Sequence, residues 1–319
     1  MRRGTSSRRR SSGFSRLLLG LNLAAAALVG GWYLAQPDTR QAEVRRLVSN
    51  AFERRKHVSP VDVAWDLWQL YYADNATGRV APGNPSIVYG GVPLASRTGP
   101  GSAPLRVLTN RGYLVGYDET RGCPAWAAYH LRDLPTLPDP LPRPEKFEID
   151  SRTTARIDPG LYTNSGYDRG HLAPNYAIAT RFGPAAQQET FLMSNIAPQR
   201  HALNAGLWKE LELKIATSYP ARYGEVWVLT GPVFGEHPRT LRGGVAIPEA
   251  FFLIVIDEHE GKLRTLALLV PQDTPAGADP ERFLTSIADI QRRTRLDFLR
   301  ELDDDAEQQV EARRADRLW

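Results

Sequence analysis

One stretch of the chain, residues 168–212, concentrates polar side chains that can act on a charged substrate. It contains DRGHLAPN at residues 168–175, SNIAPQ at 194–199, and LN, W and LE between 203 and 212. Gly166 and Gly170 bracket the start of the first block, where a permissive backbone can present a side chain to a cleft. Apolar residues recur at spacing four after position 204, as on one face of a helix. The stretch therefore predicts an extended segment, a second strand and then a helix at residues 204–216.

His171 is the side chain in this stretch best suited to proton transfer. With an unperturbed pKa near 6.5, its neutral imidazole can take a proton from water at neutral pH, so we predict that His171 is a general base. Arg169 lies two residues earlier, and on an extended segment both side chains leave the same face. Its guanidinium either grips a phosphate through paired hydrogen bonds or forms a salt bridge with Asp168 or another carboxylate.

Taken together, the three blocks resemble the DNA/RNA non-specific endonucleases, a family that includes mitochondrial endonuclease G and secreted bacterial sugar-non-specific nucleases. The resemblance covers residues 85–275. It implies an α+β fold in which a ββα-metal (His-Me finger) module of strand, turn, strand and helix lies on a central, mainly antiparallel sheet. It also implies endonuclease activity on DNA and RNA with 5′-phosphate products, a bound Mg²⁺ with Mn²⁺ as the other candidate, and a homodimer as a common state.

Three further residues complete the predicted site. Asn204 matches the family's direct metal ligand, although by itself it also fits a helix N-cap. Glu212 lies eight residues later, about 12 Å along a helix, so we expect it to hold water around the ion, with an ordinary helix-surface glutamate as the alternative. Asn195 follows the apolar residues 191–193, which we expect to form a strand, and should fix the site through hydrogen bonds.

The match to the family is incomplete at the arginines. Family members commonly carry an arginine one helical turn after the glutamate, where this chain has Ala216, and Lys214 or Arg222 are the candidates to replace that charge. A second family arginine lies upstream of residue 168, where Arg152 is the better match and Arg156 the weaker. We therefore expect Arg152 and Arg169 to bind substrate phosphate.

These assignments predict hydrolysis in which His171 activates water for in-line attack on phosphorus while the ion held by Asn204 neutralises the developing charge. Because the ion and the arginine contact only phosphate, this chemistry carries no preference for base or sugar.

The N-terminus predicts a membrane segment. Six arginines within residues 2–16 precede residues 17–35, which are apolar or small except for Asn22. Tyr33 stands where a cleavage site needs a small residue, which favours an uncleaved signal-anchor over residues 1–36 rather than a cleaved signal peptide. The positive-inside rule then places the catalytic domain outside the cytoplasm, at the periplasmic face of a bacterial inner membrane. A mitochondrial presequence is the alternative in a eukaryote.

Because the N-terminal arginines supply much of the positive charge, the net charge of +4 is weak support for nucleic-acid binding.

The rest of the chain divides into three parts. Residues 37–84 are predicted to be a helical linker region, residues 85–275 the endonuclease domain and residues 276–319 a charged helical extension with a solvated face. Residues 114–117 and 125–129 predict a hairpin, and three runs predict central strands, at 225–230, 250–256 and 263–270. The chain has 319 residues, enough for one substantial core, and Cys123 is its only cysteine, which excludes an internal disulfide.

Three alternatives remain open. Ala216 suggests a catalytically weak nucleic-acid-binding paralogue, and the membrane segment suggests a phosphodiesterase that acts on another substrate, such as a lipid headgroup. A serine hydrolase using Ser194 and His171 is the third, but the glycines of a nucleophile elbow are missing around the serine.

Overall fold

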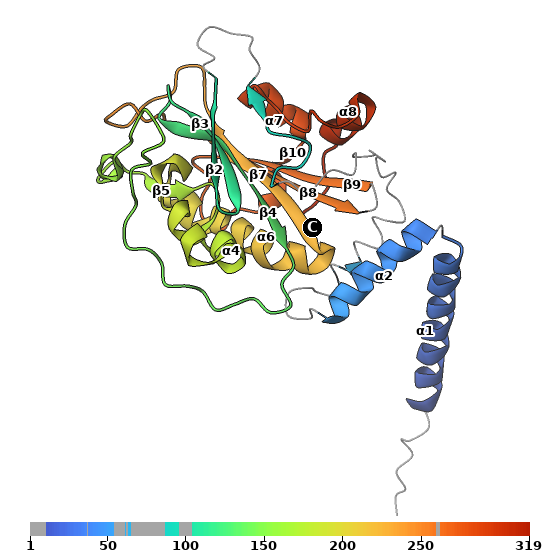
Figure 1. Ribbon diagram of the computed structural model, residues 1–319. Helices are drawn as coiled ribbons and strands as arrows, with labels where there is room; N and C mark the ends of the chain where they lie inside the picture. The colour runs from blue at the N-terminus through green and yellow to red at the C-terminus, as the bar shows by residue number, and fades with distance from the viewer. Residues whose placement is uncertain are drawn as a thin grey trace, which may run out of the picture.

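The computed structural model describes residues 11–36, 38–53, 61, 63–64, 87–95, 104–259 and 262–319. Within these residues, a seven-stranded sheet runs through the centre of the main body, with helices on both of its faces (Figure 1). The strand order is β10-β9-β8-β7-β4-β3-β2, and every neighbouring pair is antiparallel. The strands are β2 (Arg106–Asn110), β3 (Tyr113–Asp118), β4 (Cys123–Arg132), β7 (Glu225–Val233), β8 (Ala250–His259), β9 (Lys262–Pro271) and β10 (Leu284–Thr285).

The helices and the smaller strands surround this sheet. Two short pairs, β1 (Leu94–Ala95) with β11 (Leu296–Asp297) and β5 (Asp168–His171) with β6 (Ile196–Gln199), lie outside it. The helices are α1 (Ser11–Leu34), α2 (Asp38–Glu53), α4 (Asn175–Thr190), α5 (His201–Leu203), α6 (Lys209–Tyr223), α7 (Ile287–Thr294) and α8 (Asp304–Ala312). The 3-10 turns are η1 (Pro159–Tyr162), η2 (Met193–Asn195) and η4 (Pro280–Phe283), and η3 (Asn204–Trp208) is a π-helical segment.

The central strands are apolar on both faces because both faces are covered. Along β7, Val226 and Val228 enter one hydrophobic cluster while Trp227 and Leu229 enter another. A strand buried on both sides reads as a continuous apolar run, which explains the sequence AFFLIVI of β8. The predicted hairpin and the three predicted central strands are confirmed as β3 with β4, and as β7, β8 and β9.

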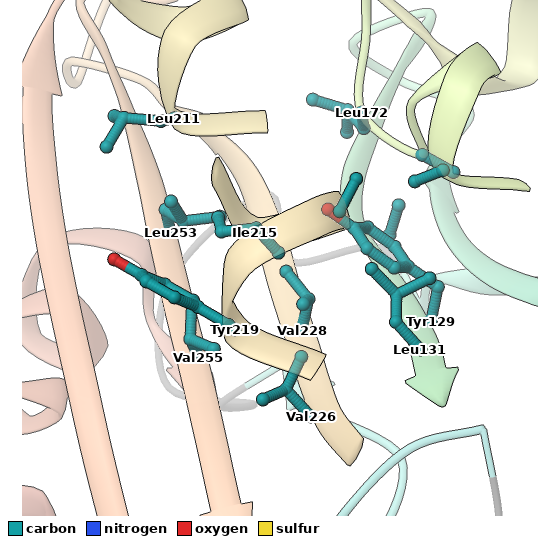
Figure 2. Packing of buried hydrophobic residues seen from close by; sticks show 14 of the residues in the cluster. Tyr129, Leu131, Leu172, Leu211, Ile215, Tyr219, Val226, Val228, Leu253 and Val255 are labelled. Carbon is teal, nitrogen blue, oxygen red and sulfur yellow. The ribbon is translucent and has the colours of Figure 1, made fainter. Parts of the chain in front are cut away.

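Helix α6 covers one face of the sheet. Figure 2 shows Leu211, Ile215 and Tyr219 of this helix against valines and leucines of β4, β7 and β8. Helix α4 packs beside it. Burial at a spacing of four residues holds the helix firmly, so that Glu212 is carried by a well-fixed element.

The opposite face is covered by the C-terminal segment. Ile287 and Ile290 of α7 and Val310 of α8 are buried against the sheet, and β10 extends the sheet beyond β9. Trp319 lies in the other cluster, 4% exposed. The charged helical extension predicted for residues 276–319 contains the helices α7 and α8, whose apolar residues are buried in the core while most of their charged residues are exposed.

The strand pair β5 and β6 carries the DRGH block. The two strands are antiparallel, with Gly170 opposite Ala197. Their connection is helix α4, kinked at Gly183, rather than the predicted turn. Residues 191–193 end α4 and begin η2, so the strand predicted there is wrong and β6 begins only at Ile196.

The described N-terminal residues include the helices α1 and α2. Val44 and Leu47 of α2 join the core cluster beside α6, and Arg46 donates to the carbonyl oxygen of Tyr223. Much of the predicted linker region 37–84 lies outside the described residues. Across the described part of the chain, no helix has both the length and the apolar character needed to cross a membrane, so the signal-anchor predicted for residues 1–36 is not supported.

Candidate active site

His171 ends β5 between two phenylalanine rings. The ring centroid of Phe191 lies 4.9 Å from that of the imidazole, edge to face, and that of Phe147 lies 5.5 Å away. Nε2 is enclosed and has no hydrogen-bond partner among the described residues. Burial, and then the positive charge of Arg143, lower the pKa of His171 from 6.5 to about 3. The imidazole is therefore neutral at physiological pH and can accept a proton.

Asp168, at the start of β5, holds Asn204. Its Oδ2 accepts a hydrogen bond from Asn204 Nδ2 at 2.9 Å and another from His201 Nδ1 at 2.8 Å. With its nitrogen engaged, the Asn204 amide keeps Oδ1 without a donor among the described residues. An amide oxygen oriented in this way is a hard ligand suited to Mg²⁺ or Mn²⁺.

Asn204 lies inside a helix rather than at its start. The helix begins at His201, and Asn204 is the first residue of the π-helical segment η3. The N-cap alternative is therefore wrong, since Arg200 occupies the cap position. A single π turn widens the helix locally and is frequent at functional sites, where it re-aims side chains.

Glu212 lies one turn into α6, directly after the π segment. Burial raises the pKa of its carboxyl from 4.5 to about 8, against the lowering effects of the Trp208 indole and the Arg143 guanidinium. No salt bridge of Glu212 is found within the described residues. The carboxyl is therefore largely protonated at neutral pH, and a cation that entered the site would favour its ionised form.

Arg143 connects the two titrating groups. It belongs to the proline-rich loop between β4 and η1, and its guanidinium lies 5.1 Å from the centroid of Phe191. It lowers the pKa of both His171 and Glu212, so its positive charge acts on both residues. Among the described residues, the Arg143 guanidinium forms neither a hydrogen bond nor an ion pair. The sequence analysis missed this arginine.

Arg169 is held by the loop that precedes β5. Its Nε and Nη2 donate to the carbonyl oxygen of Pro159 at 3.1 and 2.6 Å, and Nη2 also donates to Thr163 Oγ1. The salt bridge with Asp168 is not formed in the described structure, where Asp168 binds His201 and Asn204 instead. The Arg169 guanidinium lies 5.6 Å from the ring of Phe147, which also contacts His171. Both side chains therefore meet at one aromatic ring.

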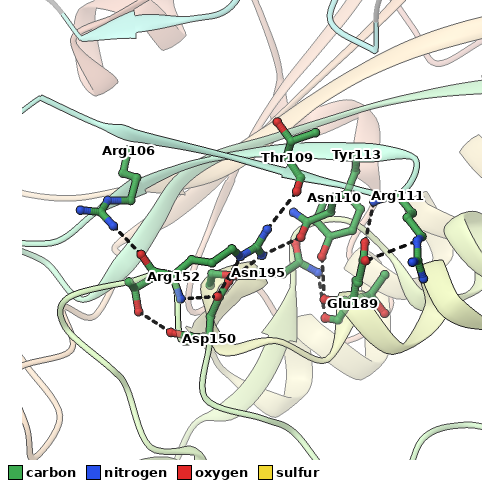
Figure 3. A network of polar contacts seen from close by, with 12 residues as sticks. Arg106, Thr109, Asn110, Arg111, Tyr113, Asp150, Arg152, Glu189 and Asn195 are labelled. Carbon is green, nitrogen blue, oxygen red and sulfur yellow. Dashed lines mark hydrogen bonds and ion pairs between the residues drawn. The ribbon is translucent and has the colours of Figure 1, made fainter.

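Arg152 lies in a separate polar network (Figure 3). Its guanidinium donates to Asp150, to the carbonyl oxygen of Thr109 and to Asn110 Oδ1 at 2.7 Å. Although burial alone would raise it, hydrogen bonds from Arg152 and Ser194 hold the pKa of Asp150 below its ordinary value. All the guanidinium nitrogens of Arg152 are thus engaged with protein groups. Arg156, the weaker of the two sequence-based candidates, is exposed and has a backbone φ of 46°.

Asn195 joins the two strands of the module. It is fully buried, and its side chain binds the backbone of Ala173 in both directions, accepting at 2.9 Å and donating at 3.0 Å, and donates to the carbonyl oxygen of Thr190. These bonds fix the chain directly after His171. Ser194 donates to Asp150 Oδ2 at 2.6 Å and makes no bond to His171, so the geometry gives the serine-hydrolase alternative no support.

Neither candidate for the missing charge at position 216 reaches the site. The Lys214 ammonium lies over the ring of Tyr219, and Arg222 is buried against Tyr223. The carbonyl oxygen of Ala216 accepts a hydrogen bond from Arg181 Nη2 at 2.6 Å. The structure therefore brings His171, Asn204, Glu212 and Arg169 to one region, adds Arg143 and leaves Arg152 in its own network.

No group of three or more His, Cys, Asp or Glu side chains is placed to hold a metal within the described ranges. A magnesium ion needs only one or two protein oxygens because it keeps several waters. Among the described residues, the amide oxygen of Asn204 has no donor and the desolvated carboxyl of Glu212 has no salt bridge, and both fit such an ion.

Comparisons with known proteins point to a family of nucleases. A family model described as DNA/RNA non-specific endonuclease matches residues 92–305. Mitochondrial endonuclease G from Bos taurus is 32% identical over 303 residues, which cover 89% of this chain and 91% of that protein. Mitochondrial nuclease EXOG from Xenopus laevis is 28% identical over 63% of this chain, and the match spans only 61% of that relative's length. A solved structure described as the EndoG/EndoGI complex shares the fold, with a TM-score of 0.55, 24% identity, and coverage of 63% of this chain and 88% of that one.

Proposed function

The chain belongs to the DNA/RNA non-specific endonuclease family, and from this premise we propose that it is a metal-dependent endonuclease that hydrolyses phosphodiester bonds of DNA and RNA. The observation that carries the proposal is the arrangement around β5. His171 at its end is neutral, Asp168 at its start holds an asparagine whose oxygen has no donor among the described residues, and the charge of Arg143 lowers the pKa of both His171 and Glu212. Two titratable groups with pKa values displaced in opposite directions are typical of a catalytic site.

His171 is the proposed general base. Its Nδ1 has no hydrogen-bond partner among the described residues and, unlike Nε2, is not enclosed. This nitrogen can take the proton of a water molecule as the oxygen attacks phosphorus. The lowered pKa keeps it unprotonated, although it also makes the base weaker. Attack on the side opposite the 3′ oxygen breaks the bond between phosphorus and that oxygen, which leaves and takes a proton from solvent. The phosphate stays on the 5′ oxygen of the downstream fragment, and the upstream fragment ends in a 3′ hydroxyl.

Asn204 and Glu212 are proposed to hold the cation, Mg²⁺ or Mn²⁺. The hydrogen bond from Asn204 to Asp168 engages the amide nitrogen and leaves Oδ1 without a donor among the described residues. The raised pKa keeps the Glu212 carboxyl protonated at neutral pH, and an entering cation would displace that proton and meet a carboxylate. When bound, the ion would neutralise the negative charge that develops on the phosphate.

Arg143 and Arg169 are proposed to bind the non-bridging phosphate oxygens. Among the described residues, neither the Arg143 guanidinium nor Arg169 Nη1 has a hydrogen-bond partner. Arg143 thereby supplies a charge that Ala216 does not. The engaged nitrogens of Arg152 favour a structural role for it over substrate binding.

A plasmid assay tests this function. The whole chain is incubated with supercoiled DNA and with single-stranded RNA, with Mg²⁺, with Mn²⁺ and with EDTA, beside His171→Ala. We expect metal-dependent cutting of both substrates, its loss in the variant and partial recovery with added imidazole. DNA ligase should reseal the nicks without prior phosphorylation, because the breaks carry 5′ phosphates. A folded wild type that binds but never cuts nucleic acid would favour the binding paralogue, and cutting of another phosphodiester alone would favour that substrate.

The cellular location is proposed separately. Two matched relatives are named as mitochondrial proteins, which favours the mitochondrial alternative over a periplasmic anchor. Import of the full chain fused to a fluorescent protein into mitochondria would test it. The homodimer remains an untested prediction.

A further inference from the structure

A polar groove opens beside the proposed active site, where three strands of the central sheet end. It encloses about 390 Å³, which is within the range of small-ligand pockets. Its lining residues come from three segments of the chain: the one after the end of β7, the one before the start of β8 and the one after the end of β9. The residues that matter here are Tyr167, Arg200, His237, Arg239, Gln272 and Asp273.

The groove begins one residue from the site. Tyr167 directly precedes Asp168, and Arg200 directly follows Gln199, the residue paired with Asp168 across β5 and β6. Asp168 in turn holds Asn204. A chain molecule cleaved at His171 can therefore continue into the groove.

A buried glutamine builds the floor. Gln272 accepts a hydrogen bond from the backbone of Arg200 at 2.9 Å and donates to the carbonyl oxygens of Pro198 and Pro248. It is 6% exposed. These three bonds tie β6 to the ends of β8 and β9, so the position of Arg200 is fixed before any ligand arrives.

Two guanidinium groups contact the side chain of Tyr167. That of Arg200 lies 5.6 Å from the ring centroid, and Arg239 Nη2 reaches the hydroxyl oxygen at 3.5 Å. Neither arginine has an acidic partner among the described residues, and His237 beside them has no partner there either. Of the carboxylates in the lining, Glu249 is paired with Arg293 at 2.6 Å, which leaves Asp273. The groove therefore offers two unpaired guanidinium groups to an anion.

We propose that this groove binds a backbone phosphate of the substrate nucleic acid next to the one that is cleaved, through Arg200 and Arg239. The inference rests on the proposed function for the identity of the anion. Paired guanidinium groups suit phosphate, and contacts to phosphate alone preserve the lack of sequence preference.

Binding without cleavage tests the groove. Anisotropy of a labelled DNA duplex is followed in EDTA over a range of salt for wild type and for Arg200→Gln with Arg239→Gln, which keeps side-chain length. We expect at least about tenfold weaker binding at low salt and a log–log salt slope smaller by about one to two. The control is Arg45→Gln with Arg132→Gln, two exposed arginines that do not line the groove, of which Arg132 pairs with Glu225 at the opposite end of β7. An equal loss in both double variants would overturn the proposal.

A small substrate separates this inference from the function itself. Bis-p-nitrophenyl phosphate is too short to occupy the groove and the site together. If the wild type hydrolyses it, the groove variant should retain its kcat/KM while its KM for DNA rises. If the kcat/KM of the groove variant fell equally on bis-p-nitrophenyl phosphate and on DNA, the groove proposal would also be overturned. If the wild type hydrolyses neither substrate, the proposed function fails, and the binding experiment in EDTA still decides the groove.

Discussion

Arg143 is a residue whose role follows only from the folded chain. Its charge lowers the pKa of His171 and of Glu212, and its own nitrogens are free among the described residues. We expect Arg143→Ala to lower kcat/KM on DNA about a hundredfold, the loss typical of one charge-stabilising donor. Arg143→Lys should be intermediate, because it keeps the charge and loses the paired hydrogen bonds.

The pH profile distinguishes this role from a structural one. Without the arginine, the pKa of His171 and of Glu212 should both rise, so the acid limb of kcat/KM should move to higher pH in Arg143→Ala and stay in place in Arg143→Lys. Arg156→Ala, at an exposed arginine in the same region of the sequence, should stay within about twofold of wild type. A larger loss of activity in Arg156→Ala than in Arg143→Ala would instead support the sequence-based prediction, in which an arginine shortly upstream of residue 168 binds the phosphate.

Glu212 links the site to stability. Its folded pKa is about 8 and its ordinary value 4.5, so between these values the folded chain holds a proton that the unfolded chain releases, and stability falls as pH rises. Glu212→Gln lacks this proton. Without divalent cations, the unfolding free energy of wild type should fall between pH 5 and pH 9, and that of Glu212→Gln should not. Over this range we therefore expect the stability of the variant relative to wild type to rise by about 2 to 4 kcal/mol.

Urea unfolding at the two pH values measures this difference. Glu210→Gln, at an exposed position of the same helix, should show no such gain. Mg²⁺ at pH 9 should stabilise wild type more than Glu212→Gln, because only wild type presents a carboxylate to the ion. An equal Mg²⁺ effect on both proteins would remove Glu212 from the proposed metal site.

At the scale of elements, the π-helical segment η3 aims Asn204 at Asp168. Gly206 lies inside it with a non-helical backbone, and a Cβ there would stand 3.0 Å from the Cα of Ala276. Gly206→Ala must therefore push the segment away from its neighbour. We expect a loss of about 1 to 3 kcal/mol in unfolding free energy and weaker activation by Mg²⁺, because Asn204 moves.

Ala202→Gly provides the matched control, since it weakens the same helix by about 1 kcal/mol without adding an atom. Its stability should fall while its Mg²⁺ activation curve remains that of wild type. If both variants shift that curve equally, helix stability rather than the shape of η3 controls the metal site.

The elements that could be predicted from the sequence are those with a distinctive local residue pattern. Strands β8 and β9 have long apolar runs, and β5 has a glycine-flanked polar block. Helix α4 was missed because Gly183 and Pro184 interrupt its pattern, and residues 191–193 were assigned to a strand because a short apolar run fits either structure. Arg143 could not be predicted, since a proline-rich loop brings it to His171 from outside the recognisable blocks.

At the scale of the molecule, the C-terminal residue completes the face that carries the site. Trp319 packs against Tyr219 at 5.6 Å and Tyr223 at 5.2 Å between ring centroids, both on α6, and the Arg264 guanidinium lies over it. Arg264 in turn pairs with the buried Asp257, which also binds Arg46 of α2. The tryptophan thus connects α2, β8, β9 and the helix that bears Glu212.

Trp319→Ala should therefore lower the unfolding free energy of the whole domain by about 3 kcal/mol, the usual result of removing a large buried aromatic side chain. Leu213→Ala, on the same helix but 51% exposed, should change it by less than about 0.5 kcal/mol. Chemical denaturation followed by tryptophan fluorescence and by far-ultraviolet circular dichroism measures both. The two signals should shift together, because α6 belongs to one core with the sheet. A loss confined to fluorescence would show that residue 319 packs on the surface of a domain that is stable without it.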